Sequence, residues 1–286
     1  MEFISPNTDR FTMLKELIKE AALEYNVFDI SGNRHLTISP PQPREEFLRR
    51  SPVILVAHYD RAEGSPGAND NSVSVFILLE TAIKLRKEGA VNWMIIFTDK
   101  EELKASEGIA SQGSYTLATE LKKLNMKAAK IFSFDACGIG DTLVISTTLE
   151  NLLKSESSRI GGGEKLRESI MELRNLALNT ARNLRMEKVV LVPTPFSDDA
   201  GFFRAGIAAQ TITMLPSDEC SALISEIRKN HGFADALINA EMKQNSRLQS
   251  IPETWRSLNS PGDSHLRLTP QHFRNVKRFA EALCKS

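Results

Sequence analysis

The sequence has no excess of charge of either sign. Its 286 residues include 36 Lys and Arg against 36 Asp and Glu, so the formal net charge is zero. Proteins that bind nucleic acid or acidic membranes through electrostatics present a basic surface. We therefore expect neither nucleic acid nor a membrane among its partners, and the charge balance leaves the oligomeric state open.

Cysteines and long apolar runs are also scarce. The three cysteines, Cys137, Cys220 and Cys284, are far apart and form no C-x-x-C pair, which excludes a disulfide scaffold and a structural zinc ribbon. No apolar run approaches the roughly 18 residues of a membrane span. The first residues, MEFISPNTDRF, lack the basic-then-apolar order of a signal peptide. These absences predict a cytoplasmic protein.

Short apolar runs alternate with helical patterns along the chain. The run VILVAH (53–58) is apolar at successive positions, as expected of a parallel strand buried on both faces. With no linker or repeat, the sequence predicts one domain over 1–286, in which 1–50 form a helix and a leading segment. The expected fold class is α/β, a three-layer sandwich with a mixed, mostly parallel β-sheet and helices on both faces. Further strands are expected at 92–99, 130–135, 141–147, 188–192 and 207–214. Helices are expected at 9–25, at 72–88 with Ser72 as the cap, at 164–185, at 270–284 and, with irregular joints, within 217–258. Loops are expected at 26–50 and 193–206.

Polar side chains gather where three of these strands end. The end of the first strand carries His58 and Asp60, the end of the second carries Glu101 and Glu102, and the end of the third carries Asp135. The loop after the first strand adds a further carboxylate, and functional groups of open α/β sheets collect at the carboxyl ends of strands. Buried carboxylates are costly unless cations or donors meet them. Oxygen ligands with one imidazole suit zinc or another divalent metal held for hydrolysis.

Five segments resemble, in the right order, the motifs of the co-catalytic zinc aminopeptidases typified by the Aeromonas and Streptomyces leucyl aminopeptidases. The resemblance extends over about residues 50–284 and implies the zinc-exopeptidase fold, which is phosphorylase/hydrolase-like. The segments are AHYDRAEGSPGANDNSVSVFILLETA, FTDKEE, FSFDACG, PFSDDAGFFRAGI and NSPGDSHLRLTPQHFRNVKRFAEAL.

The resemblance implies a role for each polar residue. His58, Asp70 and Asp135 would bind one metal, and Asp70 would bridge to a second metal that Glu102 also binds. Glu101 would be the general base on the activated water.

Asp60 would act on catalysis through His58. It would accept the other ring N–H of His58 and so fix the tautomer of the imidazole.

The sequence departs from the family pattern at two histidines. The last histidine ligand falls on Asn259, and the histidine of the S-D-H motif falls on Asp199. A neutral Asn oxygen is a poor zinc ligand and suits Mg²⁺, Mn²⁺ or Ca²⁺ better. We therefore expect one well-bound Zn²⁺ at the first site, and a second site that is vacant or holds such a harder ion. His265 would be an alternative ligand if the loop follows another path.

Three functions remain to be compared. The resemblance, with its general base and complete first metal site, implies a metal-dependent exopeptidase-like hydrolase, an aminopeptidase that acts on short peptides. The change at Asn259 favours the alternative, a non-catalytic or altered relative that binds a metal and a peptide or small molecule. Glutaminyl cyclases share the fold but keep their single zinc at the second site, which is the one weakened here. The sequence contains no G-x-S-x-G, P-loop or G-x-G-x-x-G motif.

Overall fold

The computed structural model places eight strands in one mixed sheet with the order β1-β2-β4-β3-β5-β8-β6-β7. The strands are β1 (Asn26–Ile30), β2 (Asn33–Ile38), β3 (Val53–His58), β4 (Trp93–Thr98), β5 (Lys130–Phe134), β6 (Thr142–Ser146), β7 (Val189–Val192) and β8 (Ala209–Leu215). The structure describes residues 2–41, 51–104, 106–126, 128–156, 163–230, 232–233, 237 and 250–286.

The middle of the sheet is parallel and fixes where the polar residues meet. β3 pairs in parallel with β4 and β5, and β5 pairs in parallel with β8. The antiparallel pairs are β1 with β2, β2 with β4, and β6 with β8. The carboxyl ends of β3, β4 and β5 therefore lie at one edge of the sheet. The predicted mixed, mostly parallel sheet with helices is confirmed.

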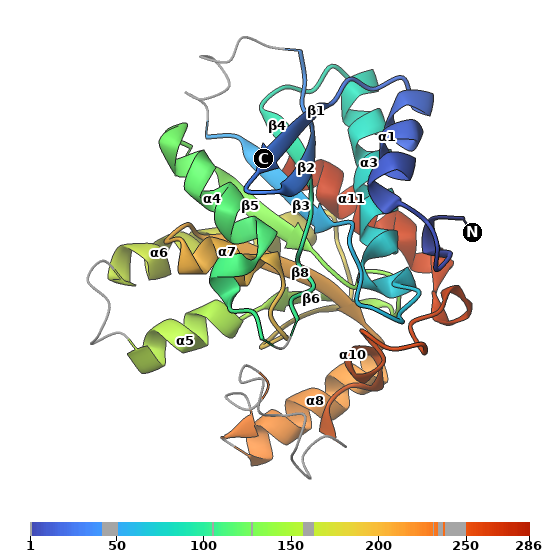
Figure 1. Cartoon of the computed structure of the whole chain (residues 1–286). Coiled ribbons are helices and arrows are strands. Elements are labelled where there is room, and N and C mark those ends of the chain that lie inside the picture. Colours follow the sequence, from blue (N-terminus) through green and yellow to red (C-terminus); the bar gives the residue numbers. More distant parts are fainter. Residues whose placement is uncertain are drawn as a thin grey trace.

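Successive side chains of β3 supply two hydrophobic cores, because side chains of a strand alternate between its faces. Val53, Leu55 and Ala57 belong to the core beneath α1, α3, α6 and α11, whereas Ile54 and Val56 belong to the core beneath α4 and α7. In Figure 1, α4 and α7 lie on one side of the sheet and α1, α3 and α11 on the other, and the core residues of α6 belong to the second group. These helices are α1 (Arg10–Glu20), α3 (Val73–Lys87), α4 (Gly113–Lys123), α6 (Gly163–Asn183), α7 (Asp198–Arg204) and α11 (Phe273–Leu283).

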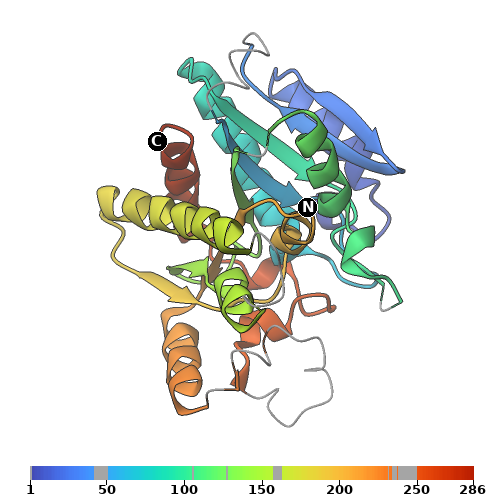
Figure 2. The same cartoon turned by 90° about the vertical axis from the view of Figure 1, so that its left-hand side faces the viewer.

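The helices α8 (Ser217–Lys229) and α10 (Glu253–Arg256) lie at the end of the molecule away from the β1–β2 hairpin (Figures 1 and 2). Cys220, Leu223 and Trp255 from these helices pack on Val144 and Leu215 of the sheet. The prediction of helices within 217–258 is confirmed for these two segments, and much of the rest lies outside the described residues. No described helix has both the length and the apolar character needed to cross a membrane. The remaining elements are α5 (Thr148–Glu156), the short turns η1 (Glu2–Ile4), η3 (Ile109–Ser111), η6 (His265–Arg267) and η7 (Pro270–His272), and the irregular turn η2 (Ala68–Ser72).

Three local expectations were wrong. Residues 26–38 form a hairpin, not a loop, with Ser31 and Gly32 at positive φ in its two-residue turn. Such turns match the twist of the paired strands. The loop expected at 193–206 contains α7. Ser72 makes no cap hydrogen bond from its side chain, because it has helical φ/ψ and its hydroxyl donates to the carbonyl oxygen of Gly67 instead.

The buried imidazole of His35 on β2 predicts an acid-sensitive stability. Its Nδ1 accepts the backbone N–H of Asp99 at 3.3 Å, and burial lowers its pKa to about 4. The unfolded chain binds the proton near pH 6.5 and the folded chain does not until pH 4, so folding stability falls as pH drops through this window, by about 3 kcal/mol at most. Denaturant unfolding at pH 7 and pH 4.5 checks this. His35→Asn, which keeps an acceptor, should lose less stability than wild type; an equal loss would contradict the prediction.

Candidate metal centre

Three side chains from separate parts of the chain converge on one point. His58 is the last residue of β3, Asp135 follows β5, and Asp70 lies in η2 between β3 and α3. Nε2 of His58 lies 3.1 Å from Oδ1 of Asp70 and 3.7 Å from Oδ1 of Asp135. One ligand atom of each residue lies within 4.8 Å of the others. This geometry can hold one metal ion with three protein ligands.

The electrostatics of the centre call for a cation. Burial and the neighbouring Asp135 raise the pKa of Asp70 to about 6, and burial and Asp70 raise the pKa of Glu102 to about 8. Burial opposes the charged form of His58, but the nearby carboxylates of Asp135, Asp60 and Asp70 outweigh it and raise its pKa well above the ordinary value. The shifts follow from burial and from the crowding of carboxylates around one imidazole, and a bound cation would relieve both.

Buried atoms without partners show that a divalent metal fits these residues. Within the described part of the chain, Nε2 of His58, Oδ1 of Asp135 and Oε1 of Glu102 are buried and lack a hydrogen-bond partner. Unsatisfied buried polar atoms are rare in folded proteins and often mark a missing ion. Imidazole nitrogen and carboxylate oxygen are both zinc ligands, and three protein ligands with an open position are the arrangement of catalytic zinc sites.

Asp60 connects the imidazole to the two glutamates. Its Oδ1 lies 3.4 Å from Nδ1 of His58 and also accepts the backbone N–H of Glu101 at 3.1 Å. Its Oδ2 accepts the backbone N–H of Glu102 at 3.0 Å. The carboxylate thus fixes the turn that follows β4 and lies beside the imidazole ring. The structure brings Asp60, Glu101 and Glu102 to the same place as His58, as the sequence predicted.

Two amides flanking Asp70 tie its loop to the segment that carries Asp135. Nδ2 of Asn71 donates to the carbonyl oxygen of Phe134 at 2.8 Å. Oδ1 of Asn69 accepts the backbone N–H of Gly138 at 2.7 Å. The bonded residues lie on either side of Asp135, so the two carboxylates are held in a fixed relation.

A carboxylate near the end of the chain fixes the other side of this loop. Asp263 accepts the backbone N–H groups of Asn69 at 2.8 Å and Asp70 at 3.0 Å. Asp263 is buried, and its own pKa is raised by burial. It therefore fixes the backbone at Asp70, although it is not one of the three residues of the cluster.

Two arginines join the N-terminal segment of the chain to the same loop. Arg10 of α1 is buried and donates to the carbonyl oxygens of Tyr59, Asp60, Pro66 and Gly67 as well as that of Phe3. A Cβ at position 67 would come within 2.7 Å of Nη2 of Arg10, and φ there is +60°, so only glycine fits. In the opposite direction, Arg61 of the loop donates to the carbonyl oxygens of residues 4–6.

Comparison with known proteins agrees with this centre and its fold. The family model described as Peptidase family M28 matches residues 37–251. The chain belongs to peptidase family M28. No curated protein sequence matches it.

Solved structures share the M28 fold at low identity. A zinc aminopeptidase from Bacillus subtilis has 18% identity and a TM-score of 0.54, with 88% of this chain and 48% of that one covered. The LapA aminopeptidase of Legionella pneumophila has 15% identity and a TM-score of 0.60, with 96% and 64% covered. The Porphyromonas gingivalis glutaminyl cyclase has 14% identity and a TM-score of 0.57, with 96% and 88% covered. The chain thus spans about half the length of the Bacillus protein, and these similarities show the fold alone.

The resemblance places the last histidine ligand of the family at Asn259, with His265 as the alternative. Asn259 has a positive φ of 59° and is exposed, as is His265. Among the described residues, the cluster of candidate ligands contains His58 and two aspartates and does not contain His265. Glu102 and Asn259 as ligands of a second metal therefore remain a prediction.

Two aspartates that the sequence did not assign to the centre lie buried beside it. Asp198 accepts the hydroxyl of Thr98 at 2.7 Å, and burial raises its pKa to about 6. Asp199, at the position of the S-D-H histidine, accepts the backbone N–H of Ser197 at 3.0 Å, and burial raises its pKa to about 7. In the sequence, two adjacent aspartates within an otherwise apolar segment could have indicated that these side chains are buried.

Cys137 is a buried thiol near Asp135, and burial raises its pKa to about 12.

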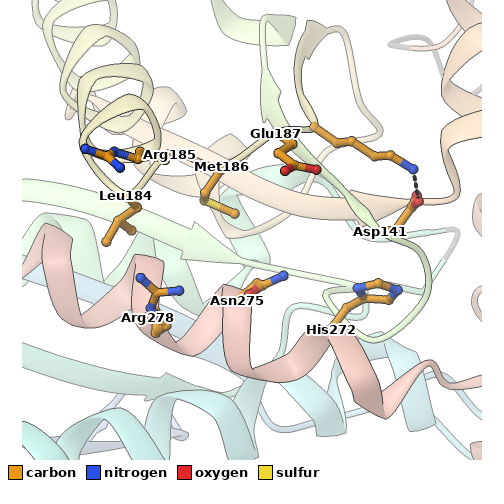
Figure 3. A pocket seen from close by; sticks show the side chains of 9 residues that line it. Asp141, Leu184, Arg185, Met186, Glu187, His272, Asn275 and Arg278 are labelled. Atoms are coloured by element: carbon orange, nitrogen blue, oxygen red, sulfur yellow. Dashed lines mark hydrogen bonds and ion pairs between the residues drawn. The ribbon is translucent and has the colours of Figure 1, made fainter.

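A hollow of about 380 Å³ lies between the end of α6 and α11 (Figure 3). Lys188 forms an ion pair with Asp141 at its edge. The hollow is separate from the metal centre, because its lining contains none of the predicted site residues. It is lined by Asp141, Leu184, Arg185, Met186, Glu187, Lys188, His272, Asn275 and Arg278.

Proposed function

We propose that this M28 protein is a metal-dependent exopeptidase that removes N-terminal residues from short peptides. The observation that carries the proposal is the convergence of His58, Asp70 and Asp135 beside Glu101, whose backbone Asp60 fixes. A Zn²⁺ held by the three residues would polarise the scissile carbonyl and lower the pKa of a water.

Glu101 performs the proton transfer in this proposal. Burial, with the neighbouring Glu102 and Asp135, raises its pKa well above the ordinary value of a carboxyl. A carboxylate with a raised pKa is a better base near neutral pH and can return the proton to the leaving amine. In this proposal Asp60 keeps the ring of His58 oriented during the proton transfer by Glu101.

Aminoacyl-nitroanilides, tested with added Zn²⁺, Mn²⁺ or Co²⁺, would test this proposal. Turnover that depends on metal supports the exopeptidase. An N-terminal glutaminyl peptide belongs in the same panel, since cyclisation without release of an amino acid would indicate cyclase chemistry. The exposed Asn259 favours a second candidate, a peptide-binding relative without activity. Tight peptide binding without turnover under any metal would support that candidate.

We expect the metal-free protein to gain stability on binding one equivalent of Zn²⁺. Repulsion among the crowded carboxylates is relieved when a cation binds the folded state, and a ligand at 100 times its Kd contributes about 2.7 kcal/mol, or about 5 °C in Tm. Thermal unfolding during a Zn²⁺ titration measures the shift, and elemental analysis measures the stoichiometry. Asp70→Asn should abolish the shift. Two tightly held zinc ions per chain would contradict the single-site prediction, and an unchanged Tm would contradict the centre itself.

A further inference from the structure

The carboxylate of Glu101 has a hydrogen-bond partner that the sequence did not indicate. Nε2 of Gln112 donates to Oε1 of Glu101 at 3.1 Å. The same nitrogen lies 3.5 Å from the carbonyl oxygens of Glu101 and Ser197. Gln112 is only 2% exposed and stands just before α4, far from solvent.

The chemistry of its neighbours fixes which end of the amide faces Glu101. Three oxygens surround Nε2, and all of them are acceptors, so an oxygen placed there would meet only repulsion. At the other end, Oε1 of Gln112 accepts the hydroxyl of Ser114 at 3.0 Å. The amide can therefore satisfy its neighbours in one orientation only.

The fold leaves room for this buried amide by means of a glycine on the facing helix. A Cβ at Gly201 of α7 would come within 2.2 Å of Oγ of Ser114 and 2.8 Å of Oε1 of Gln112. The close packing of α4 against α7 thus encloses the pair of Gln112 and Ser114 on the side away from Glu101.

We propose that Gln112 is a positioning residue that holds the Glu101 carboxylate for proton transfer. Asp60 fixes the backbone of Glu101, and Gln112 fixes its Oε1, which leaves Oε2 to take the proton from the attacking water. The inference rests on the proposed exopeptidase function. It adds a residue whose effect is on turnover and not on metal or substrate binding, because Gln112 contacts the base and none of the three metal-binding residues.

Gln112→Met keeps the length of the side chain and removes the donor. Losing a hydrogen bond to a charged group should lower kcat about 10- to 100-fold, with KM and metal content unchanged. Ser114→Ala, which removes the hydrogen bond to Oε1 of Gln112, should give a smaller loss in kcat. The matched control is Gln210→Met, because Gln210 is also a buried glutamine and donates to the carbonyl oxygens of Ser146 at 2.8 Å and Thr211 at 3.1 Å. That variant should lower Tm and leave kcat unchanged.

Crystal structures of metal-loaded wild type and Gln112→Met give a readout that does not depend on activity. The carboxylate of Glu101 should rotate away from its wild-type position in the variant. A Gln112→Met protein with kcat within about threefold of wild type, or with an unmoved carboxylate, would overturn the inference. If wild type turns over no substrate of the panel, the proposed function fails, and the position of Glu101 in the two structures decides the role of Gln112 by itself.

Discussion

Glu101→Gln is expected to lower kcat by about 100- to 10,000-fold, the usual contribution of a general base, while the protein keeps its metal. Gln has the shape of Glu but cannot accept a proton. Glu101 lies outside the cluster of His58, Asp70 and Asp135, so its replacement leaves all three ligands in place. Removing one of several crowded negative charges should also leave folding intact, since burial raises the pKa of Glu101 well above its ordinary value.

Steady-state kinetics and metal analysis of the same preparations would check this result. The matched control is Glu107→Gln, a glutamate of the same loop whose carboxylate pairs with Lys100 at 2.9 Å. It should keep wild-type kcat. A Glu101→Gln protein with more than about a tenth of the wild-type kcat would remove Glu101 from the role of base, as would loss of metal together with loss of activity.

The sequence predicts the parallel strands and the metal cluster for the same physical reason. Strands buried on both faces need continuous apolar runs, and 53–58 is such a run, buried at every position. Ionisable residues at the ends of such runs, among them His58 and Asp135, are conspicuous because burial makes them costly. Such a pattern is visible in a short stretch of sequence, without knowledge of which residues the stretch contacts in the fold.

The hairpin and the supporting contacts could not be read in that way. β1 is exposed or half-buried at every position, so it lacks the alternation of polar and apolar residues that marks a half-buried strand. Asp263 contacts a loop more than 190 residues earlier in the chain. Gln112 and Asp198 reach the site only because α4 and α7 pack beside it. Contacts between distant segments produce no pattern in a short stretch of sequence. A Gln that is buried in the fold cannot be distinguished by sequence from a Gln at the surface.

Arg10 donates hydrogen bonds to a loop about 50 residues later in the chain, and its replacement is expected to have the second large effect. We expect Arg10→Met to lower the free energy of unfolding by about 3–5 kcal/mol, because several buried or partly buried carbonyl oxygens lose a donor. Four of these oxygens belong to residues 59, 60, 66 and 67, in the loop between His58 and Asp70. The affinity for Zn²⁺ should therefore fall together with stability. Denaturant unfolding of metal-free protein and a Zn²⁺ titration at a temperature where the variant is folded would measure the two effects separately.

Arg10→Lys distinguishes the shape of the guanidinium from its charge. An ammonium has three donors around one point and cannot span carbonyl oxygens that the planar guanidinium contacts through Nε, Nη1 and Nη2. The lysine variant should accordingly lose most of what the methionine variant loses, whereas Arg204→Met, at an exposed arginine of α7, should change neither measurement. Wild-type zinc affinity in a folded Arg10→Met protein would mean that the loop keeps its shape without α1. Weakened affinity would mean that α1, which contributes no predicted ligand, is part of what builds the metal centre.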